Sequence, residues 1–223
     1  MKRFFVDVDT QVDLCFRHSS LYVPGAEDIL DNCELMVHQA VKLNHLIIGS
    51  VDTNAYDSWK FKSNKNLGPN GEKPNLSAHC VKGTNGWLKM NDTMVKRSVF
   101  IPDVGFHSKD WDRLLAKKDA QAFYFEKEIH SMFTNKNADL FFEHLLQEEP
   151  VEFIVFGVAT DHCVKTTSLE LVDFLNSRKI SGVVKVVTDA IAGRLSETIK
   201  QATEEMKSKG VKFITTQEVL SQS

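Results

Sequence analysis

Short apolar runs recur along the chain, and longer stretches with helical spacing of apolar residues lie between them. The six runs lie at residues 3–8, 46–51, 122–125, 153–158, 183–187 and 211–214. Helical spacing is found at residues 26–41, 139–146, 163–176 and 196–207. Strands that alternate with helices are typical of a parallel sheet covered by helices. The pattern predicts an α/β fold in three layers, with a six-stranded, mostly parallel sheet between helices on both faces.

One segment interrupts this alternation. Residues 52–95 are rich in Asn, Gly, Pro, Ser and Lys. A loop of that length inside a compact domain is usually functional or mobile rather than a mere connector. Because 223 residues suit one domain, we expect a single domain over residues 1–223 with a long loop insertion at about 52–95.

The charge balance narrows the classes of partner. Twenty-seven Lys and Arg against thirty Asp and Glu give a formal charge of -3, which favours neither a nucleic-acid surface nor a polybasic membrane anchor. No stretch approaches the roughly 18 apolar residues of a membrane span, and acids stand near the start, where a signal peptide needs an apolar run. The four cysteines lack C-x-x-C spacing, so we expect free thiols and a cytoplasmic location.

Polar residues follow the apolar runs at the positions where the strands are expected to end. In an open α/β sheet, ligands bind beyond the carboxyl ends of the strands, so these positions are candidates for a site. They are Asp9, Asp52, Lys127, the segment 159–163 and Asp189. The sequence therefore predicts that an acid, a lysine and a cysteine meet at one rim of the sheet.

Cys163 is the strongest candidate for a nucleophile. It stands where a predicted strand ends and a helix begins, and the N–H groups at a helix start stabilise a thiolate and can hold an oxyanion. The alternative is an inert buried thiol, as most free cysteines are.

Asp9 and Lys127 are candidates for the groups that work with the thiol. A carboxylate beside a thiol can accept its proton and later deliver that proton to a leaving amine. The charge of Lys127 would keep Asp9 ionised and lower the pKa of the thiol. The alternative for Lys127 is a solvated lysine paired with Glu126 or Glu128.

Asp52, Asn54 and His79 form a weaker candidate for a metal site. Oxygen and imidazole ligands suit a divalent ion such as zinc, manganese or iron, with water completing its shell. His162 lies beside the thiol, but adjacent side chains at a helix start point in different directions. We therefore expect His162 to pack near the site rather than to act as a base.

Five segments together resemble the cysteine hydrolases of the isochorismatase-like superfamily, and among these they are most similar to nicotinamidases and pyrazinamidases. The segment GVATDHCV is the most specific of them and nearly matches the nucleophile motif of that family. The five are FVDVDTQVDLC at 5–15, SLYVPGA at 20–26, HCVKGTNG at 79–86, KEIHSMF at 127–133 and GVATDHCV at 157–164.

The resemblance implies a role for each matching residue. Cys163 would be the nucleophile, Asp9 the general base and acid, and Lys127 the third active-site member. A cis peptide between Val158 and Ala159 would turn the Ala159 N–H inward, where it would form the oxyanion hole with the N–H of Cys163.

The sequence departs from the nicotinamidase pattern at the metal loop. That pattern reads D-x-H and holds an ion that binds the pyridine nitrogen of the substrate, whereas here the loop reads Asp52-Thr53-Asn54. Asn is a poor zinc ligand. The metal set predicted from the resemblance is therefore Asp52, Asn54 and His79, without the expected second imidazole.

A second departure concerns the walls of the pocket. The substrate ring is commonly stacked between a Phe and a Trp in this family, and Leu14 and Leu76 stand at the matching positions. An aromatic surface would then have to come from Trp59 or another ring of the insertion. The residues predicted to bind substrate are Leu14, Leu76, Phe133 and Val158.

These implications give three hypotheses for function. The first is hydrolysis of a small-molecule amide through a cysteine thioester, with nicotinamide to nicotinate and ammonia, a step of NAD salvage, as the leading case. The second keeps the chemistry but takes another amide, such as a ureido or carbamoyl compound. The third is a non-catalytic ligand-binding protein on the same fold. Family members are often homo-oligomers, so a homo-oligomer is an expectation by analogy.

Overall fold

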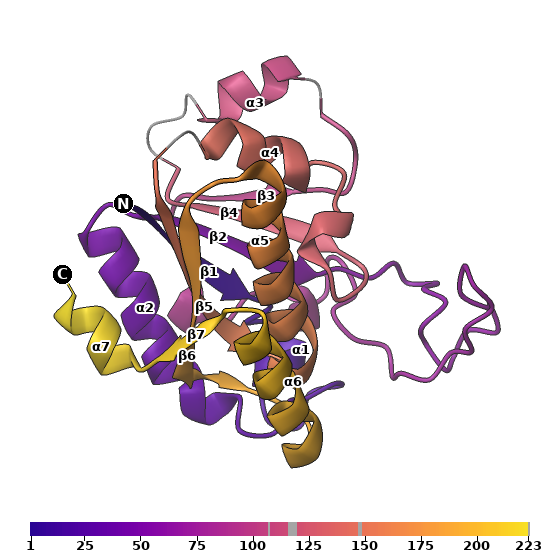
Figure 1. Ribbon diagram of the computed structural model, residues 1–223. Helices are drawn as coiled ribbons and strands as arrows, with labels where there is room; N and C mark the ends of the chain where they lie inside the picture. The colour runs from indigo at the N-terminus through magenta and orange to yellow at the C-terminus, as the bar shows by residue number, and fades with distance from the viewer. Residues whose placement is uncertain (107, 116–119, 147–148, 223) are drawn as a thin grey trace.

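The computed structural model describes residues 1–106, 108–115, 120–146 and 149–222. Within this part of the chain, seven strands form one parallel sheet in the order β3-β4-β2-β1-β5-β6-β7 (Figure 1). The strands are β1 (Lys2–Val8), β2 (Leu46–Asp52), β3 (Ser98–Ile101), β4 (Ala122–Lys127), β5 (Val151–Val158), β6 (Gly182–Ala192) and β7 (Lys212–Ile214).

The central strands are apolar because both of their faces are covered. In β1, Phe4 and Phe5 point to opposite faces and are both fully buried. Every residue of β5 is buried as well. Continuous apolar runs therefore mark the middle of the sheet.

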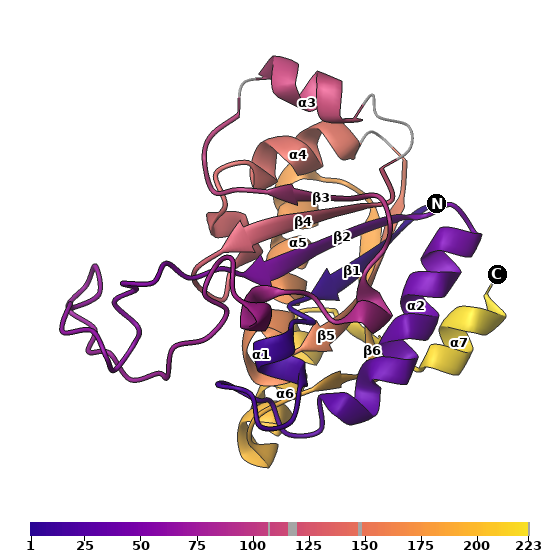
Figure 2. The ribbon, with the colours of Figure 1, turned by 180° about the vertical axis from the view of Figure 1, so that it is seen from behind.

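Helices cover both faces, which gives the three predicted layers (Figures 1 and 2). The core on one face includes residues of α1 (Val12–Cys15), α2 (Leu30–Lys42) and α7 (Thr216–Ser221). The core on the other face includes residues of α3 (Ser108–Leu115), α4 (Ala138–Leu145), α5 (Lys165–Arg178) and α6 (Ser196–Ser208).

The predicted count of six strands is wrong by one. The missed strand is β3, a four-residue edge strand that is buried only at Ile101. It follows Lys96-Arg97 and precedes Pro102. A short, half-exposed edge strand carries too few apolar residues to stand out in the sequence. The four predicted helical segments correspond to α2, α4, α5 and α6.

The chain between β2 and β3 has little regular structure. Its described helical turns are two short 3-10 segments, Asn85–Trp87 and Asn91–Thr93. Figures 1 and 2 show part of this insertion as a long purple arm that reaches away from the sheet. Its base returns to the carboxyl ends of the central strands, since the Asn54 N–H donates to the Cys80 carbonyl oxygen at 3.0 Å.

Among the described residues, no helix combines the length and the apolar composition that crossing a membrane would require.

Candidate active site

The carboxyl ends of β1, β2, β4 and β5 open into one cavity of about 500 Å³. Four of the polar residues predicted at this rim line it, namely Asp9, Asp52, Lys127 and Cys163. Asp189 does not belong with them. It lies within β6, and its Oδ1 accepts hydrogen bonds from the backbone N–H and the hydroxyl of Thr216 at the start of α7.

Asp9, Lys127 and Cys163 meet in this cavity. The Lys127 Nζ lies 2.7 Å from Asp9 Oδ2 and 3.4 Å from Cys163 Sγ. The Ser50 hydroxyl donates to Asp9 Oδ1 at 2.7 Å. Each carboxylate oxygen therefore has a donor that orients it, and the ammonium bridges the carboxylate and the sulfur.

The backbone that carries the thiol is unusual. A cis peptide joins Val158 and Ala159, as the resemblance implied. Residues Thr160–Val164 then form a single π-helical turn that leads into α5. Just before, β5 runs so close to β1 that a Cβ on Gly157 would lie 2.1 Å from the Val8 carbonyl oxygen, so glycine is required there. Asp9 thus follows β1 directly beside the turn that holds Cys163.

Burial and the neighbouring charges shift the pKa values of both Lys127 and Cys163. Burial lowers the pKa of the Lys127 ammonium, but the charge of Asp9 and the nearby Cys163 and Asp52 outweigh it, so the net pKa is raised. Burial raises the pKa of the Cys163 thiol, the Lys127 charge opposes this, and Asp9 and Asp52 add to it. The expectation that Lys127 would lower the thiol pKa holds for its own contribution only. The raised pKa means that the resting Cys163 thiol is protonated at neutral pH.

This protonation state predicts the pH dependence of alkylation. Only the thiolate reacts, and a raised pKa means that its fraction continues to rise above the pKa of an ordinary thiol, about 8.5. We expect the rate at which iodoacetamide labels Cys163 to keep increasing above about pH 8.5, measured by peptide mass spectrometry. Cys15, Cys33 and Cys80 are buried and serve as internal controls that stay unlabelled. A rate that levels off below about pH 8.5 would contradict the raised pKa.

Comparison with known proteins gives the family of this chain. A sequence profile described as Isochorismatase domain matches residues 4–218. The chain belongs to the isochorismatase family. A search of curated proteins returned no match.

Solved structures of this family share the fold at low sequence identity. Pyrazinamidase of Pyrococcus horikoshii, solved in complex with zinc, is 21% identical with a TM-score of 0.69, over 96% of this chain and 99% of that one. L. infantum PnC1, solved with nicotinate, is 18% identical with a TM-score of 0.68, over 97% and 93%. N-carbamoylsarcosine amidase from Thermoplasma acidophilum is 16% identical with a TM-score of 0.65, over 97% of each chain. The TM-scores show a shared fold, and sequence identities this low do not identify a substrate.

The structure divides the four residues predicted to bind substrate. Leu14 and Leu76 line the cavity of this family member. Phe133 and Val158 are not among its lining residues. The Phe133 ring stacks on Phe142, with centroids 5.2 Å apart, and so belongs to the helix layer. Val158 is fully buried in the core on the other face.

The predicted metal ligands also lie near one another, but their contacts do not suit a divalent ion. His79 Nε2 lies 3.0 Å from Asp52 Oδ2, and Asn54 Nδ2 donates to the same oxygen at 3.2 Å. Lys60 Nζ lies 3.7 Å from Asp52 Oδ1. Among the described residues, no three His, Cys, Asp or Glu side chains gather as a metal set would. Asp52 and His79 are ordinary zinc ligands, but a zinc site takes three or four protein donors and an Asn amide is a poor third one, so this donor set does not fit zinc.

Sequence reasoning missed several residues of the cavity. Lys60 lines it from the insertion, where no periodicity marks it, and Arg194 lines it from the loop after β6. Trp59, which the sequence offered as an aromatic surface, lines the cavity as well. Ser50 carried a signal, because it is a polar residue inside an apolar run.

Two histidines form part of the rim of this cavity. The rings of His130 and His162 lie 4.9 Å apart between centroids, and both residues line the cavity. Burial, with the charges of His162 and Lys127 adding to it, lowers the pKa of His130 to about 4. Burial likewise lowers the pKa of His162. Neutral imidazoles therefore stand beside the thiol, and His162 faces the cavity rather than only packing near it.

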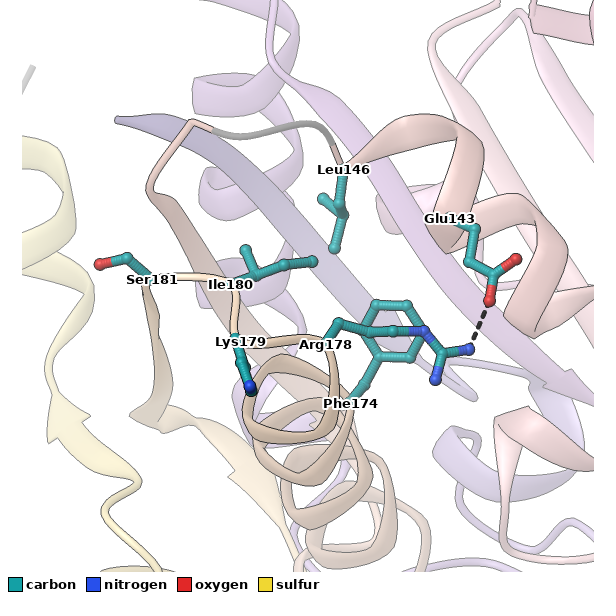
Figure 3. A pocket seen from close by; sticks show the side chains of 7 residues that line it. All are labelled: Glu143, Leu146, Phe174, Arg178, Lys179, Ile180 and Ser181. Atoms are coloured by element: carbon teal, nitrogen blue, oxygen red, sulfur yellow. Dashed lines mark hydrogen bonds and ion pairs between the residues drawn. The ribbon is translucent and has the colours of Figure 1, made fainter.

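A second cavity, of about 590 Å³, lies around the loop between α5 and β6 (Figure 3). An ion pair between Arg178 and Glu143 spans part of it, and the Arg178 guanidinium lies over the Phe174 ring at 5.2 Å. Its seven lining residues include no thiol or carboxylate–lysine–thiol group like that of the first cavity. The carboxylate, lysine and thiol therefore meet at the first cavity and not at this one.

Proposed function

We propose that this protein hydrolyses the carbon–nitrogen bond of a small-molecule amide through a thioester on Cys163, with nicotinamide as the leading substrate. The observation that carries the proposal is the meeting of carboxylate, ammonium and thiol within 2.7 and 3.4 Å in one cavity. Hydrolysis of nicotinamide would yield nicotinate and ammonia, which is a step of NAD salvage.

The proposed sequence of steps begins with a proton transfer. Asp9 accepts the proton of the Cys163 thiol as the sulfur attacks the amide carbonyl carbon. The ammonium of Lys127 lies beside both groups and stabilises the negative charge that moves from the carboxylate to the sulfur. The thiol therefore needs no low resting pKa, because it loses its proton only as the carbon–sulfur bond forms.

The backbone turn after β5 supplies the oxyanion site in this proposal. The N–H groups of Ala159 and Cys163 would donate to the oxygen of the tetrahedral intermediate. Asp9 then returns its proton to the leaving nitrogen, the carbon–nitrogen bond breaks and ammonia departs. A water molecule, deprotonated by the same carboxylate, attacks the thioester, which releases the acid and restores the thiol.

A ureido or carbamoyl compound is the second candidate substrate. Leu14 and Leu76 offer no aromatic ring for stacking at their positions, and Arg194 and Lys73 are among the lining residues together with Trp59. Two cationic residues in the lining suit the oxygen atoms of a polar substrate. The fold likeness to N-carbamoylsarcosine amidase is compatible with this candidate.

Ammonia release from a panel of amides tests both candidates. We expect purified protein to release ammonia from nicotinamide and pyrazinamide, with Cys163→Ala protein as the blank. Release from carbamoyl compounds alone would transfer the proposal to the second candidate. Release from no member of a broad small-amide panel would favour the non-catalytic alternative.

A further inference from the structure

Lys60 reaches from the insertion into the floor of the cavity beside Asp52. Its Nζ lies 3.7 Å from Asp52 Oδ1 and also donates to the Glu128 carbonyl oxygen. The side chain is 11% exposed. A lysine that is nearly buried needs partners for its charge, and here a carboxylate and a carbonyl from two different strand ends supply them.

His79 is another neighbour of Asp52. Its Nδ1 lies 2.7 Å from the Ser77 carbonyl oxygen, and its Nε2 lies 3.0 Å from Asp52 Oδ2. Both ring nitrogens therefore face oxygen atoms of the protein within hydrogen-bond distance.

Asn54 is oriented the wrong way for a ligand. Its Nδ2 donates to Asp52 Oδ2 and, at 3.0 Å, to the His79 carbonyl oxygen. Turning the amide over would set its oxygen against these two acceptors. The buried Oδ1 has no hydrogen-bond partner among the described residues, and Asn54 is not among the residues that line the cavity. Its amide therefore supports Asp52 from behind.

We propose that the Lys60 ammonium takes the place that the resemblance assigned to a divalent ion, so that the cavity binds its ligand without metal. One donor of the ammonium goes to the Glu128 carbonyl oxygen and the ion pair with Asp52 holds the group in place, which leaves a donor for an acceptor atom of the ligand. The second half of this inference rests on the proposed function. It defines the substrate class as small amides that carry a hydrogen-bond acceptor, such as a ring nitrogen or a carbonyl oxygen, on the side away from the amide bond that is cleaved.

The charges support this assignment. The single positive charge of Lys60 is matched by the single negative charge of Asp52. A divalent ion added beside them would be repelled by the ammonium at close range, and the Asp52 carboxylate already pairs with that ammonium. A neutral acceptor atom adds no charge and suits an ammonium that has a donor to spare.

Zinc binding tests the first half of the inference, that the site holds no divalent ion, and this test needs no turnover. It is measured in the Cys163→Ala background, so that the thiol is not a ligand, by equilibrium dialysis with zinc and by the shift in Tm. We expect the protein with Lys60 and Asn54 intact to retain no stoichiometric zinc and to show no shift. Adding Asn54→His and Lys60→Met removes the ammonium and supplies a second imidazole, and we expect affinity to rise by about 100-fold. One tightly held zinc per chain with Lys60 and Asn54 intact would overturn the inference.

A matched pair of ligands tests the second half. Nicotinamide and benzamide differ in one ring atom, the acceptor nitrogen. In the Cys163→Ala background, we expect nicotinamide to bind about 10-fold or more tighter than benzamide. Lys60→Met should abolish this preference and Lys60→Arg, which keeps a donor, should retain part of it. Equal Kd values for the pair with Lys60 intact, or no binding of either, would overturn the acceptor role.

The two halves and the proposed function fail separately. A protein that shows the Lys60-dependent preference but releases no ammonia from any amide would contradict the proposed hydrolysis and leave the ammonium site standing. A protein that hydrolyses amides but needs zinc would contradict the ammonium site and leave the hydrolysis standing.

Discussion

Replacing Cys163 with alanine is expected to lower kcat by about ten-thousand-fold or more for the amide that the protein hydrolyses. Alanine has no atom that can form the thioester. The oxyanion site and Asp9 then have no covalent adduct to stabilise or protonate. The fold should persist, because Cys163 lies at the cavity and not in the sheet core. The measurement is ammonia release under saturating amide, together with trapping of the thioester by mass spectrometry in wild-type protein.

Cys33→Ala is the matched control for this experiment. Cys33 is buried in α2, and its Sγ lies 3.5 Å from the Ala190 carbonyl oxygen, on a different element from the nucleophile. We expect its kcat to stay at the wild-type level, although some stability is lost with the buried sulfur. If Cys163→Ala and wild type release ammonia at equal rates, Cys163 is not the nucleophile.

Replacing Lys89 with methionine is expected to lower the free energy of unfolding by about 3–5 kcal/mol. The Lys89 Nζ lies 2.8 Å from Asp7 Oδ2 and 2.7 Å from Thr10 Oγ1, and its side chain is 1% exposed. It also lies over the Tyr124 ring, 4.3 Å from the centroid. Without the ammonium, the Asp7 carboxylate is left buried in β1 without its counter-charge. Urea unfolding followed by circular dichroism gives the difference.

The position of Lys89 adds a consequence for the insertion. Lys89 forms an isolated antiparallel β-bridge with Gln11, and the Met90 N–H donates to the Thr10 carbonyl oxygen at 2.9 Å. The buried ion pair with Asp7 therefore fastens the end of the insertion to β1, the strand that Asp9 follows. We expect the loss of stability in Lys89→Met to be accompanied by faster proteolysis of the insertion.

Two variants make this result specific. Lys82→Met removes another ion pair, with Glu126 at 2.7 Å, but Lys82 is 53% exposed, so the expected loss is below about 1 kcal/mol. Adding Asp7→Asn to Lys89→Met removes the unpaired charge, and we expect it to recover about 1–2 kcal/mol. A Lys89→Met protein as stable as Lys82→Met would contradict the buried pair.

Local sequence predicted most of the architecture for a physical reason. Strands buried on both faces need continuous apolar runs, and helices that cover them need one apolar stripe. Six of the seven strands carry that signal. Strand β3 lies at the sheet edge, where solvent replaces one neighbour and the apolar demand falls. Asp189 was misplaced because β6 continues to Ala192, beyond its apolar run.

In the candidate site, too, the residues at strand ends were predicted from the sequence and those of irregular segments were not. Asp9 follows β1 directly, Lys127 ends β4 and Cys163 lies in the turn after β5. The order of elements along the chain was therefore enough to bring them to one rim. Lys60, by contrast, lies in an irregular segment whose path depends on contacts with distant residues, such as the Glu128 carbonyl oxygen. No spacing rule predicts such a contact.

The sequence by itself determined the parallel sheet, the rim and the residue types available for chemistry, because regular elements impose regular patterns. Only the tertiary structure decided that an ammonium lies beside Asp52. It also decided that the amide of Asn54 turns its N–H toward that carboxylate. Both depend on how the insertion folds back on the sheet, and long-range contacts of irregular backbone leave no period in the chain.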